Sequence, residues 1–598
     1  MNLTTLDWTI IGAYFIFALA IGIGLSRSAG KDMQEFFLSG RNMPWWLLGV
    51  SMVATTFSSD TPNLVTGFVR EDGVAKNWSW WAFLLTGMLT VFVYAKLWRR
   101  ANILTDIEFY ELRYSGWAAA FLRGFRALYL GLIFNVMVMG AVSLAAIKFG
   151  EIILGIPGWQ TLLIAGSITL AYSAFGGLKA VIVTDFVLFV LAMIGSVWAC
   201  VYLLGLPEVG GRSKLLTHPE VQSKHSLVPD FSDPAQWVPL ILIPLAVQWW
   251  ASYYPGAEPG GGGYIAQRMF SAKDEKQAIG ATLFFNVAHY ALRPWPWILI
   301  GLASIVVFPT LGDIQDAFPT LSAGKLGHDV AYPAMLTKLP SGLLGLVAAS
   351  LIAAFMSTMS TQINLGASYL VNDFYQRFLK PDATQKELVQ AGRVFTIISM
   401  VLGIGLGLLL KDASQAFNLL LLLGSGTGLI FILRWFWWRI NAYTEIIAMV
   451  ASLIIASYFT FLHDKTGFLP MEDWEKIIFG AVLTTSIWII SVFVTPHTKQ
   501  ETLVAFYQRI RPAALGWKPV IDRAHAEGIA LDPEPGQLPL EIACMIIGCL
   551  TVYGTLFAMG YWLYGQTGPA MASTLVALGG AYFLFRVWDK LKTQKAEG

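Results

Sequence analysis

The sequence of 598 residues predicts an all-α polytopic membrane protein with about 15 transmembrane helices. Two observations carry this prediction. Hydrophobic residues make up 56% of the chain and charged residues only 13%, which is too little charge for the water-exposed surface of a soluble protein this long. Apolar segments long enough to cross a bilayer as helices recur along the whole chain. The same composition excludes fibrous, disordered and disulfide-scaffold proteins, and a net charge of +2 argues against a nucleic-acid partner.

The expected spans follow one another with short polar connections between most of them. They cover residues 7–25, 45–67, 78–98, 123–149, 159–175, 179–204, 237–254, 280–308, 341–372, 390–410, 414–436, 441–463, 475–495, 540–563 and 570–586. The longest polar stretches between them are residues 205–236 and 496–538. Within the second stretch, residues 506–512 are expected to lie either along the membrane surface or in a solvated loop helix.

Basic residues predict the orientation of these spans, because loops on the cytoplasmic side carry an excess of Lys and Arg. If the N-terminus lies outside and the C-terminus inside, most of the 40 Lys and Arg residues fall in cytoplasmic connections. The basic groups at residues 96–126, 377–393 and 499–523 contribute most to this asymmetry. The sequence therefore predicts an outside N-terminus and the cytoplasmic placement of residues 496–538.

The second expected span is crowded with polar side chains between Ser51 and Asn63, and Pro62 stands near the end of this cluster. A helix facing lipid does not tolerate such a cluster. An unwound stretch whose free carbonyl groups face a cavity satisfies the backbone instead. The sequence therefore predicts an interrupted helix here.

A second interruption is expected in the seventh span. Pro239 and Pro244 precede Gln248, and a glycine run at Gly260–Gly263 follows the span. Transporters often build a central site from two interrupted helices in equivalent halves. A five-plus-five inverted repeat formed by residues 45–204 and 237–436 would place both interruptions near the centre of the membrane.

A polar stripe marks the ninth span. Ser357, Ser360, Thr361 and Asn364 share one helical face. Hydroxyl groups on membrane helices often serve only to join helices. However, Asp185 lies in the sixth span, and the sequence shows no obvious fixed basic partner for it. A cage of hydroxyl, carbonyl and carboxylate oxygens suits a hard cation, and the shortage of carboxylates indicates sodium.

Several ordered motifs resemble the sodium:solute symporter family over roughly residues 5–515. The motifs are Phe37 to Arg41, Tyr172 to Val181 with Thr184 and Asp185, Gln267 and Arg268, and Met356 to Thr358. The resemblance implies a LeuT-like inverted-repeat fold with flanking helices, and sodium-driven uptake by alternating access. It implies an integral membrane protein and not an enzyme, and we expect a bacterial inner-membrane location.

The resemblance also implies the ion ligands. The first sodium site falls on the carbonyls of Ala54, Phe57 and Ala354 and the hydroxyls of Ser357 and Thr358. A possible second sodium site falls on Asp185, Ser360 and Thr361, together with Ser357. Three regions result: the first helix and a cytoplasmic linker at residues 1–44, the transport core at residues 45–436, and additional transmembrane helices at residues 437–598. The oligomeric state stays open, although Gly403 and Gly407 permit close helix packing.

The solute is less well defined by the sequence than the ion. The candidate solute ligands are Thr56, Ser58, Asp60 and Thr61 at the first interruption, with Trp80, Asn135, Gln248 and Trp249 on other spans. Asp60 would repel an anion and suit a polyol or a cationic amine, whereas Arg293 would favour a carboxylate. We favour a sugar or polyol as the solute. An amino acid or a carboxylate, and a nutrient sensor built on the same core, remain the alternatives.

Overall fold

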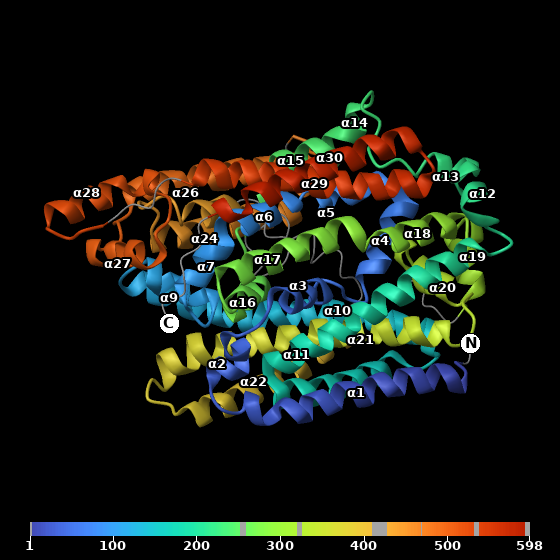
Figure 1. Cartoon of the computed structure of the whole chain (residues 1–598), viewed down its shortest axis with the longest axis horizontal. Coiled ribbons are helices and arrows are strands. Elements are labelled where there is room, and N and C mark those ends of the chain that lie inside the picture. The colour runs from blue at the N-terminus through green and yellow to red at the C-terminus, as the bar shows by residue number, and fades with distance from the viewer. Residues whose placement is uncertain are drawn as a thin grey trace.

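The computed structural model describes residues 3–250, 259–319, 326–409, 427–467, 469–531 and 537–591. In these ranges every extended regular element is a helix, and Met43 and Ala272 form an isolated β-bridge. The long helices lie side by side along the longest axis of the molecule (Figure 1). Eleven of the described helices are long and apolar enough to cross a membrane. The all-α membrane fold is therefore confirmed, while the count of about 15 spans stays a prediction.

The N-terminal half supplies the first set of helices. They are α1 (Thr5–Ala29), α3 (Trp45–Thr55), α4 (Thr61–Asp72), α5 (Trp78–Trp81), α6 (Leu84–Leu89), α7 (Ala95–Ala101), α8 (Phe109–Arg113), α9 (Trp117–Leu128), α10 (Asn135–Phe149) and α11 (Gly158–Leu204). A short helix, α2 (Met33–Leu38), links α1 to α3, and two further short helices, α12 (Gly211–Thr217) and α13 (Pro219–Gln222), follow α11.

The remaining helices complete the core and the C-terminal region. They are α14 (Pro234–Trp237), α15 (Ile243–Ala246), α16 (Gly263–Ser271), α17 (Glu275–Asn286), α18 (Trp295–Val307), α19 (Leu311–Ala317), α20 (Ala331–Leu336), α21 (Leu343–Ser368), α22 (Gln385–Leu409), α24 (Ala442–Ser457), α25 (His463–Thr466), α26 (Asp473–Val494), α27 (Gln500–Ile510), α28 (Lys518–Ala526), α29 (Leu538–Tyr564) and α30 (Thr567–Val587). The π-helical segment η9 (Val287–Leu292) joins α17 to α18.

The 47-residue helix α11 contains two of the expected spans. Gly177 interrupts its regular geometry with a φ of 56° and a ψ of −160°, which is a conformation that glycine adopts far more readily than other residues. The bend separates the expected spans at residues 159–175 and 179–204.

The first interrupted span has the predicted form. α3 ends at Thr55, α4 begins at Thr61, and the residues between them are not helical. In the second interrupted span, α15 ends at Ala246 and α16 begins at Gly263. Residues 251–258 within it, and most of the expected span at residues 414–436, lie outside the described residues.

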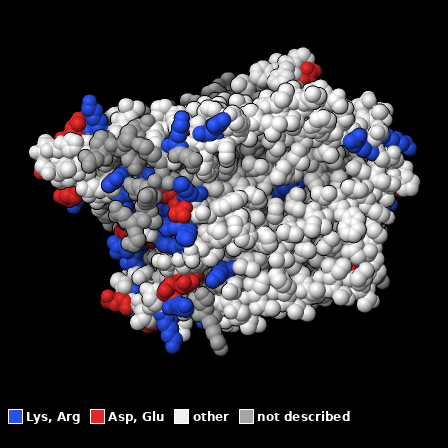
Figure 2. Space-filling model, in the orientation of Figure 1, with Lys and Arg blue, Asp and Glu red and all other residues white. Residues whose placement is uncertain are grey.

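Segments that the sequence assigns to one side of the membrane lie at one end of the bundle. α2, α9 and α27 lie at one end of the long axis, and α12, α13 and α19 lie at the other (Figure 1). Charged side chains gather at the end with α9 and α27 (Figure 2). This grouping agrees with the predicted alternation of the spans, while the side that faces the cytoplasm stays a prediction.

The segment at residues 506–512 includes the end of helix α27, as both expected alternatives allow. Phe506 is fully buried, stacks on Trp517 at 5.3 Å, and meets Phe109 edge-on at 5.8 Å. The face with Phe506 and Tyr507 packs against the bundle, while Gln508, Arg509 and Arg511 are exposed. The segment therefore belongs to an amphipathic helix, and the aromatic rings of its buried face contact other aromatic rings of the same chain.

A candidate ion and solute site at the interrupted helix

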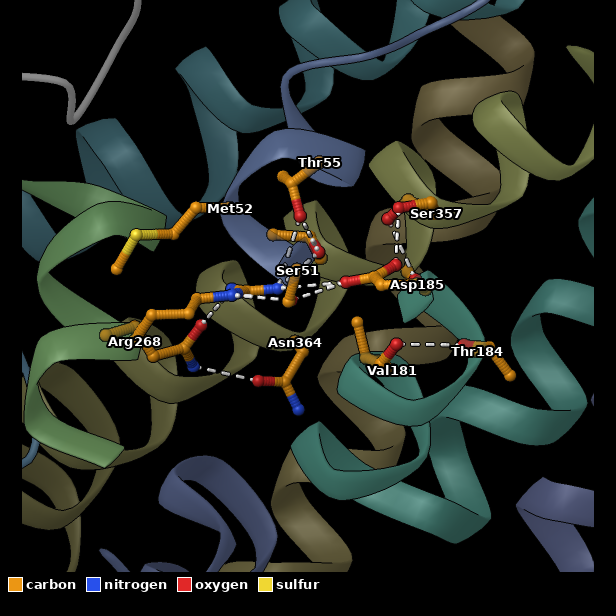
Figure 3. Close-up of polar contacts among 12 residues, drawn as sticks. Ser51, Met52, Thr55, Val181, Thr184, Asp185, Arg268, Ser357 and Asn364 are labelled. Carbon is orange, nitrogen blue, oxygen red and sulfur yellow. Dashed lines mark hydrogen bonds and ion pairs between the residues drawn. The ribbon is translucent and has the colours of Figure 1, made fainter. Parts of the chain in front are cut away.

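Asp185 joins three helices in the interior of the bundle. Its Oδ2 accepts a hydrogen bond from Ser51 Oγ of α3 at 2.6 Å, and its Oδ1 accepts one from Ser357 Oγ of α21 at 2.5 Å. The guanidinium of Arg268 on α16 lies 3.7 Å from Asp185 Oδ2 (Figure 3). Both charged side chains are fully buried. The carboxylate that the sequence singled out therefore lies where α3, α11, α16 and α21 meet.

The expectation that Asp185 has no basic partner is wrong. Arg268 is that partner, and it also donates to Ser51 Oγ at 3.2 Å. The sequence placed Arg268 in a motif of its own but gave no reason to pair it with Asp185. The pairing arises because α16 packs against both α3 and α21.

The polar face of α21 points to the same place. Arg268 donates to Thr361 Oγ1 at 2.8 Å, and Gln267 Nε2 donates to Asn364 Oδ1 at 2.9 Å. Ser360 lies on this face too, but its hydroxyl donates to the carbonyl of Ser357 on its own helix. Most members of the predicted stripe thus contact other helices through their side chains.

The end of α3 lies against α21, where the first sodium site is expected. Thr358 Oγ1 donates to the carbonyl of Thr55 at 3.2 Å, and the carbonyl of Ala54 accepts from the amide of Phe57 at 3.1 Å. The five expected ligands are all buried; they are Ala54, Phe57, Ala354, Ser357 and Thr358. Hydroxyl groups of α21 and carbonyl groups of α3 therefore meet at this junction.

Opposite charges lie on the two sides of the interruption between α3 and α4. Arg293 donates to the carbonyl of Val53 at 3.0 Å and to that of Thr56 at 3.2 Å. Asp60 immediately precedes α4, and its side chain is exposed. Helix dipoles favour a cation at a C-terminus and an anion at an N-terminus. Arg293 and Asp60 therefore suit the ends of the half-helices at which they lie.

The aromatic candidate on the third span lies near the interruption. The ring of Trp80 stacks on Tyr290 at 5.7 Å and meets the ring of His289 at 5.5 Å. His289 Nδ1 lies 3.3 Å from Thr56 Oγ1. Thr56, Thr61 and Trp80 are partly exposed. Tyr290 was not among the candidates, because a tyrosine in an apolar run carries no distinctive sequence signal.

Two of the other candidate solute ligands, Asn135 and Gln248, contact backbone groups. Asn135 Nδ2 donates to the carbonyl of Gln362 at 2.8 Å, and Gln248 Nε2 donates to that of Ser79 at 3.2 Å. The carbonyl of Trp249 accepts from Thr86 Oγ1. Ser58 is buried. In this structure Asn135 and Gln248 join neighbouring helices through these contacts.

Comparison with known proteins identifies the family. The model of the sodium:solute symporter family matches residues 36–454. The chain belongs to the sodium:solute symporter family. The match confirms the resemblance that the sequence motifs indicate, and it identifies the chain as a relative of sodium-coupled transporters.

Curated relatives extend over most of this symporter. A sodium/glucose cotransporter from Vibrio parahaemolyticus is 26% identical over 505 residues, which cover 81% of this chain and 89% of that protein. The human sodium/myo-inositol cotransporter 2 is 25% identical over 484 residues, which cover 75% of this chain and 69% of that protein. A structure of a Na⁺-coupled sialic acid symporter in a substrate-bound outward-open state has a TM-score of 0.67 at 19% identity, covering 83% of this chain and 99% of that one. The last comparison shows a shared fold, in agreement with the LeuT-like fold that the sequence predicts.

Proposed function

We propose that this symporter uses the sodium gradient to import a small polar organic solute by alternating access, in the inner membrane of a bacterium. The observation that carries the proposal is the junction of interrupted α3 with α21 and α11, where carbonyl, hydroxyl and carboxylate oxygens meet. Such oxygens are the ligands that hard cations prefer. Interrupted helices whose free backbone groups face a site are a common device of ion-coupled transporters.

We assign the first sodium ion to the carbonyls of Ala54, Phe57 and Ala354 and the hydroxyls of Ser357 and Thr358. Two of these residues support the assignment most directly. Thr358 already reaches α3 through its hydroxyl group, and Ser357 reaches Asp185. A sodium ion at this junction would hold α3 and α21 together.

We assign a second sodium ion to Asp185, Ser360, Thr361 and Ser357. Arg268 lies on Asp185 and donates to Thr361, so this ion and the Arg268 guanidinium would compete for the same oxygens. Binding of the second ion therefore requires Arg268 to move away from Asp185.

For the solute, we favour a sugar or another polyol that contacts the interruption between α3 and α4. Arg293 is buried and already donates to two backbone carbonyls, so its guanidinium is poorly placed to bind a solute carboxylate. Asp60, Thr56 and Thr61 are accessible, and carboxylate and hydroxyl oxygens accept hydrogen bonds from a polyol. Several relatives carry sugar or inositol cotransporter names, which supports the same choice.

A fluorescence titration of the purified protein tests the proposal. Tryptophan emission is followed while glucose, myo-inositol, an amino acid panel and a carboxylate panel are added in sodium, lithium or potassium chloride. We expect a saturable signal with a sugar or polyol that appears only in sodium. A signal confined to amino acids or carboxylates would overturn the solute assignment, and equal signals in all three salts would overturn sodium coupling.

Uptake into reconstituted vesicles separates a transporter from a sensor. We expect the solute found by fluorescence to accumulate in the vesicles only when an inward sodium gradient is imposed. Sodium-dependent binding without accumulation would favour the nutrient-sensor alternative.

A further inference from the structure

The end of α3 is held by side chains from two other helical segments. From α21, Thr358 Oγ1 donates to the carbonyl of Thr55 at 3.2 Å. From the junction of η9 and α18, the guanidinium of Arg293 donates to the carbonyls of Val53 and Thr56 at 3.0 and 3.2 Å. The last carbonyls of a helix lack their usual backbone donors, so these contacts orient the end of α3 together with the local hydrogen bond from Thr56 Oγ1 to the carbonyl of Val53 at 2.8 Å.

The two carbonyls bound by Arg293 adjoin the pair proposed for sodium. Val53 and Thr56 are three residues apart, and so are Ala54 and Phe57. The second pair is the first pair moved along the chain by one residue. Each carbonyl that Arg293 holds therefore belongs to the chain neighbour of a proposed sodium ligand, because Val53 precedes Ala54 and Thr56 precedes Phe57. Holding the first pair restricts how the second pair can turn.

Aromatic rings hold the guanidinium of Arg293 in place. It lies 5.4 Å from the centre of the Trp297 ring and 5.9 Å from that of Phe57, and these two rings stack at 5.2 Å. The Arg293 side chain is only 2% exposed. The ring of Phe57 contacts the guanidinium, and the backbone carbonyl of Phe57 is a proposed sodium ligand. The two sites therefore share this residue.

We propose that Arg293 is a positioning residue for sodium binding and not a ligand of the solute. It holds the last turn of α3 so that the carbonyls of Ala54 and Phe57 face α21. The inference rests on the proposed function, because it assumes that sodium binds at this junction. It also resolves the opposed indications of Asp60 and Arg293, since only Asp60 is accessible to a solute.

Binding of radioactive sodium to the purified protein, without any solute, tests this proposal. The variants are Arg293→Gln and Arg293→Lys. Hydrogen bonds from a charged donor are stronger than neutral ones, so Gln should raise the sodium concentration for half-saturation on the order of 10-fold. Lys keeps the charge but lacks the planar fork that reaches two carbonyls, so it should raise this concentration by a smaller factor.

Arg70→Gln is the matched control. Arg70 is a buried arginine that donates to the carbonyls of Ser304 and Phe308 at 2.6 and 2.7 Å, at the far end of α18. It therefore performs the same kind of capping outside the interruption. We expect Arg70→Gln to lower the melting temperature and to leave the sodium concentration for half-saturation unchanged.

The outcomes separate this inference from the proposed function. Wild-type sodium affinity in either folded Arg293 variant would overturn the inference, and so would an equal loss of affinity in Arg70→Gln. If Arg293→Gln does not fold, Arg293→Lys decides. Failure of the wild-type protein to bind sodium would instead overturn the proposed function.

Discussion

At the scale of single residues, the buried pair of Asp185 and Arg268 determines how the proposed second sodium ion can bind. A buried charge that loses its partner is costly, because no water replaces the lost interaction. Asp185 has three partners, and two of them are the hydroxyls of Ser51 and Ser357. A sodium ion that displaces Arg268 would take over its role as the counter-charge of Asp185.

Replacement of Asp185 by Asn should lower the sodium cooperativity of uptake. If two ions bind, the Hill coefficient for sodium should fall towards one in Asp185→Asn, because the amide keeps the size of the side chain but removes its charge. Uptake into vesicles at varied sodium concentration measures this coefficient. An unchanged coefficient would contradict the second sodium site.

The same substitution should destabilise the protein, because Arg268 then remains buried without its carboxylate. Loss of one partner of a buried ion pair costs about 3 kcal/mol or more. We expect a lower melting temperature for Asp185→Asn and recovery of much of the loss in the double variant Asp185→Asn with Arg268→Gln. No recovery in the double variant would show that the pair does not set the stability of this region.

At the residue scale, the sequence identified the chemical groups better than their partners. Asp185, Ser357 and Thr361 stood out because polar groups in apolar spans are costly, and the structure brings them together. Arg268 could not be paired with Asp185 in advance, because that contact depends on how α16 packs between α3 and α21.

At the scale of helices, the start of α21 is fixed by contacts with a residue far away in the sequence. Asp7 in the first turn of α1 accepts hydrogen bonds from the amides of Gly342 and Gly345 at 2.7 and 2.8 Å. These amides lie at the start of α21, where an anion complements the helix dipole. The first helix of the chain therefore caps the helix that carries the proposed sodium ligands.

Replacement of Asp7 by Ala should therefore destabilise the start of α21. The loss of a capping carboxylate costs about 1–2 kcal/mol. We expect a lower melting temperature for Asp7→Ala, measured on the purified protein. Asp316→Ala is the matched control, because Asp316 is exposed near the end of α19. Equal melting temperatures for the two variants would contradict the capping role of Asp7.

The interruption of the first core helix could be predicted because its cause is local. Polar residues and a proline close together are incompatible with a continuous lipid-facing helix. The two helical runs of α11 match the spans expected at residues 159–175 and 179–204, but the shape of the break at Gly177 could not be predicted, because a glycine between two apolar runs permits either a loop or a kink. The two runs pack against α1 and α21, and contacts with such distant segments cannot be inferred from the local sequence.

At the scale of the whole molecule, one helix outside the range of the family match, α29, packs against the core, and α30 packs on α29. α29 packs against α6 and η9, and Lys96 of α7 forms a buried ion pair with Glu541 of α29. Tyr553 donates to the carbonyl of Trp81 at 2.8 Å. The sequence predicted α29 and α30 as spans from their length and apolar composition, but their place in the bundle depends on contacts between distant residues.

The orientation of the bundle is the last prediction at this scale. Connections expected in the cytoplasm carry most of the basic residues, and such an excess marks the cytoplasmic side. The native cysteines, Cys200, Cys544 and Cys549, are buried, so a new exposed cysteine should be the main site of labelling. Lys214→Cys on α12 should react with a membrane-impermeant maleimide in intact cells, whereas Gln508→Cys on α27 should react only after the membrane is opened. Both positions are exposed, so a difference in labelling reports the side of the membrane. The reverse pattern would place α9 and α27 outside. The basic residues at that end would then contribute to contacts within the protein and would not mark the cytoplasmic side.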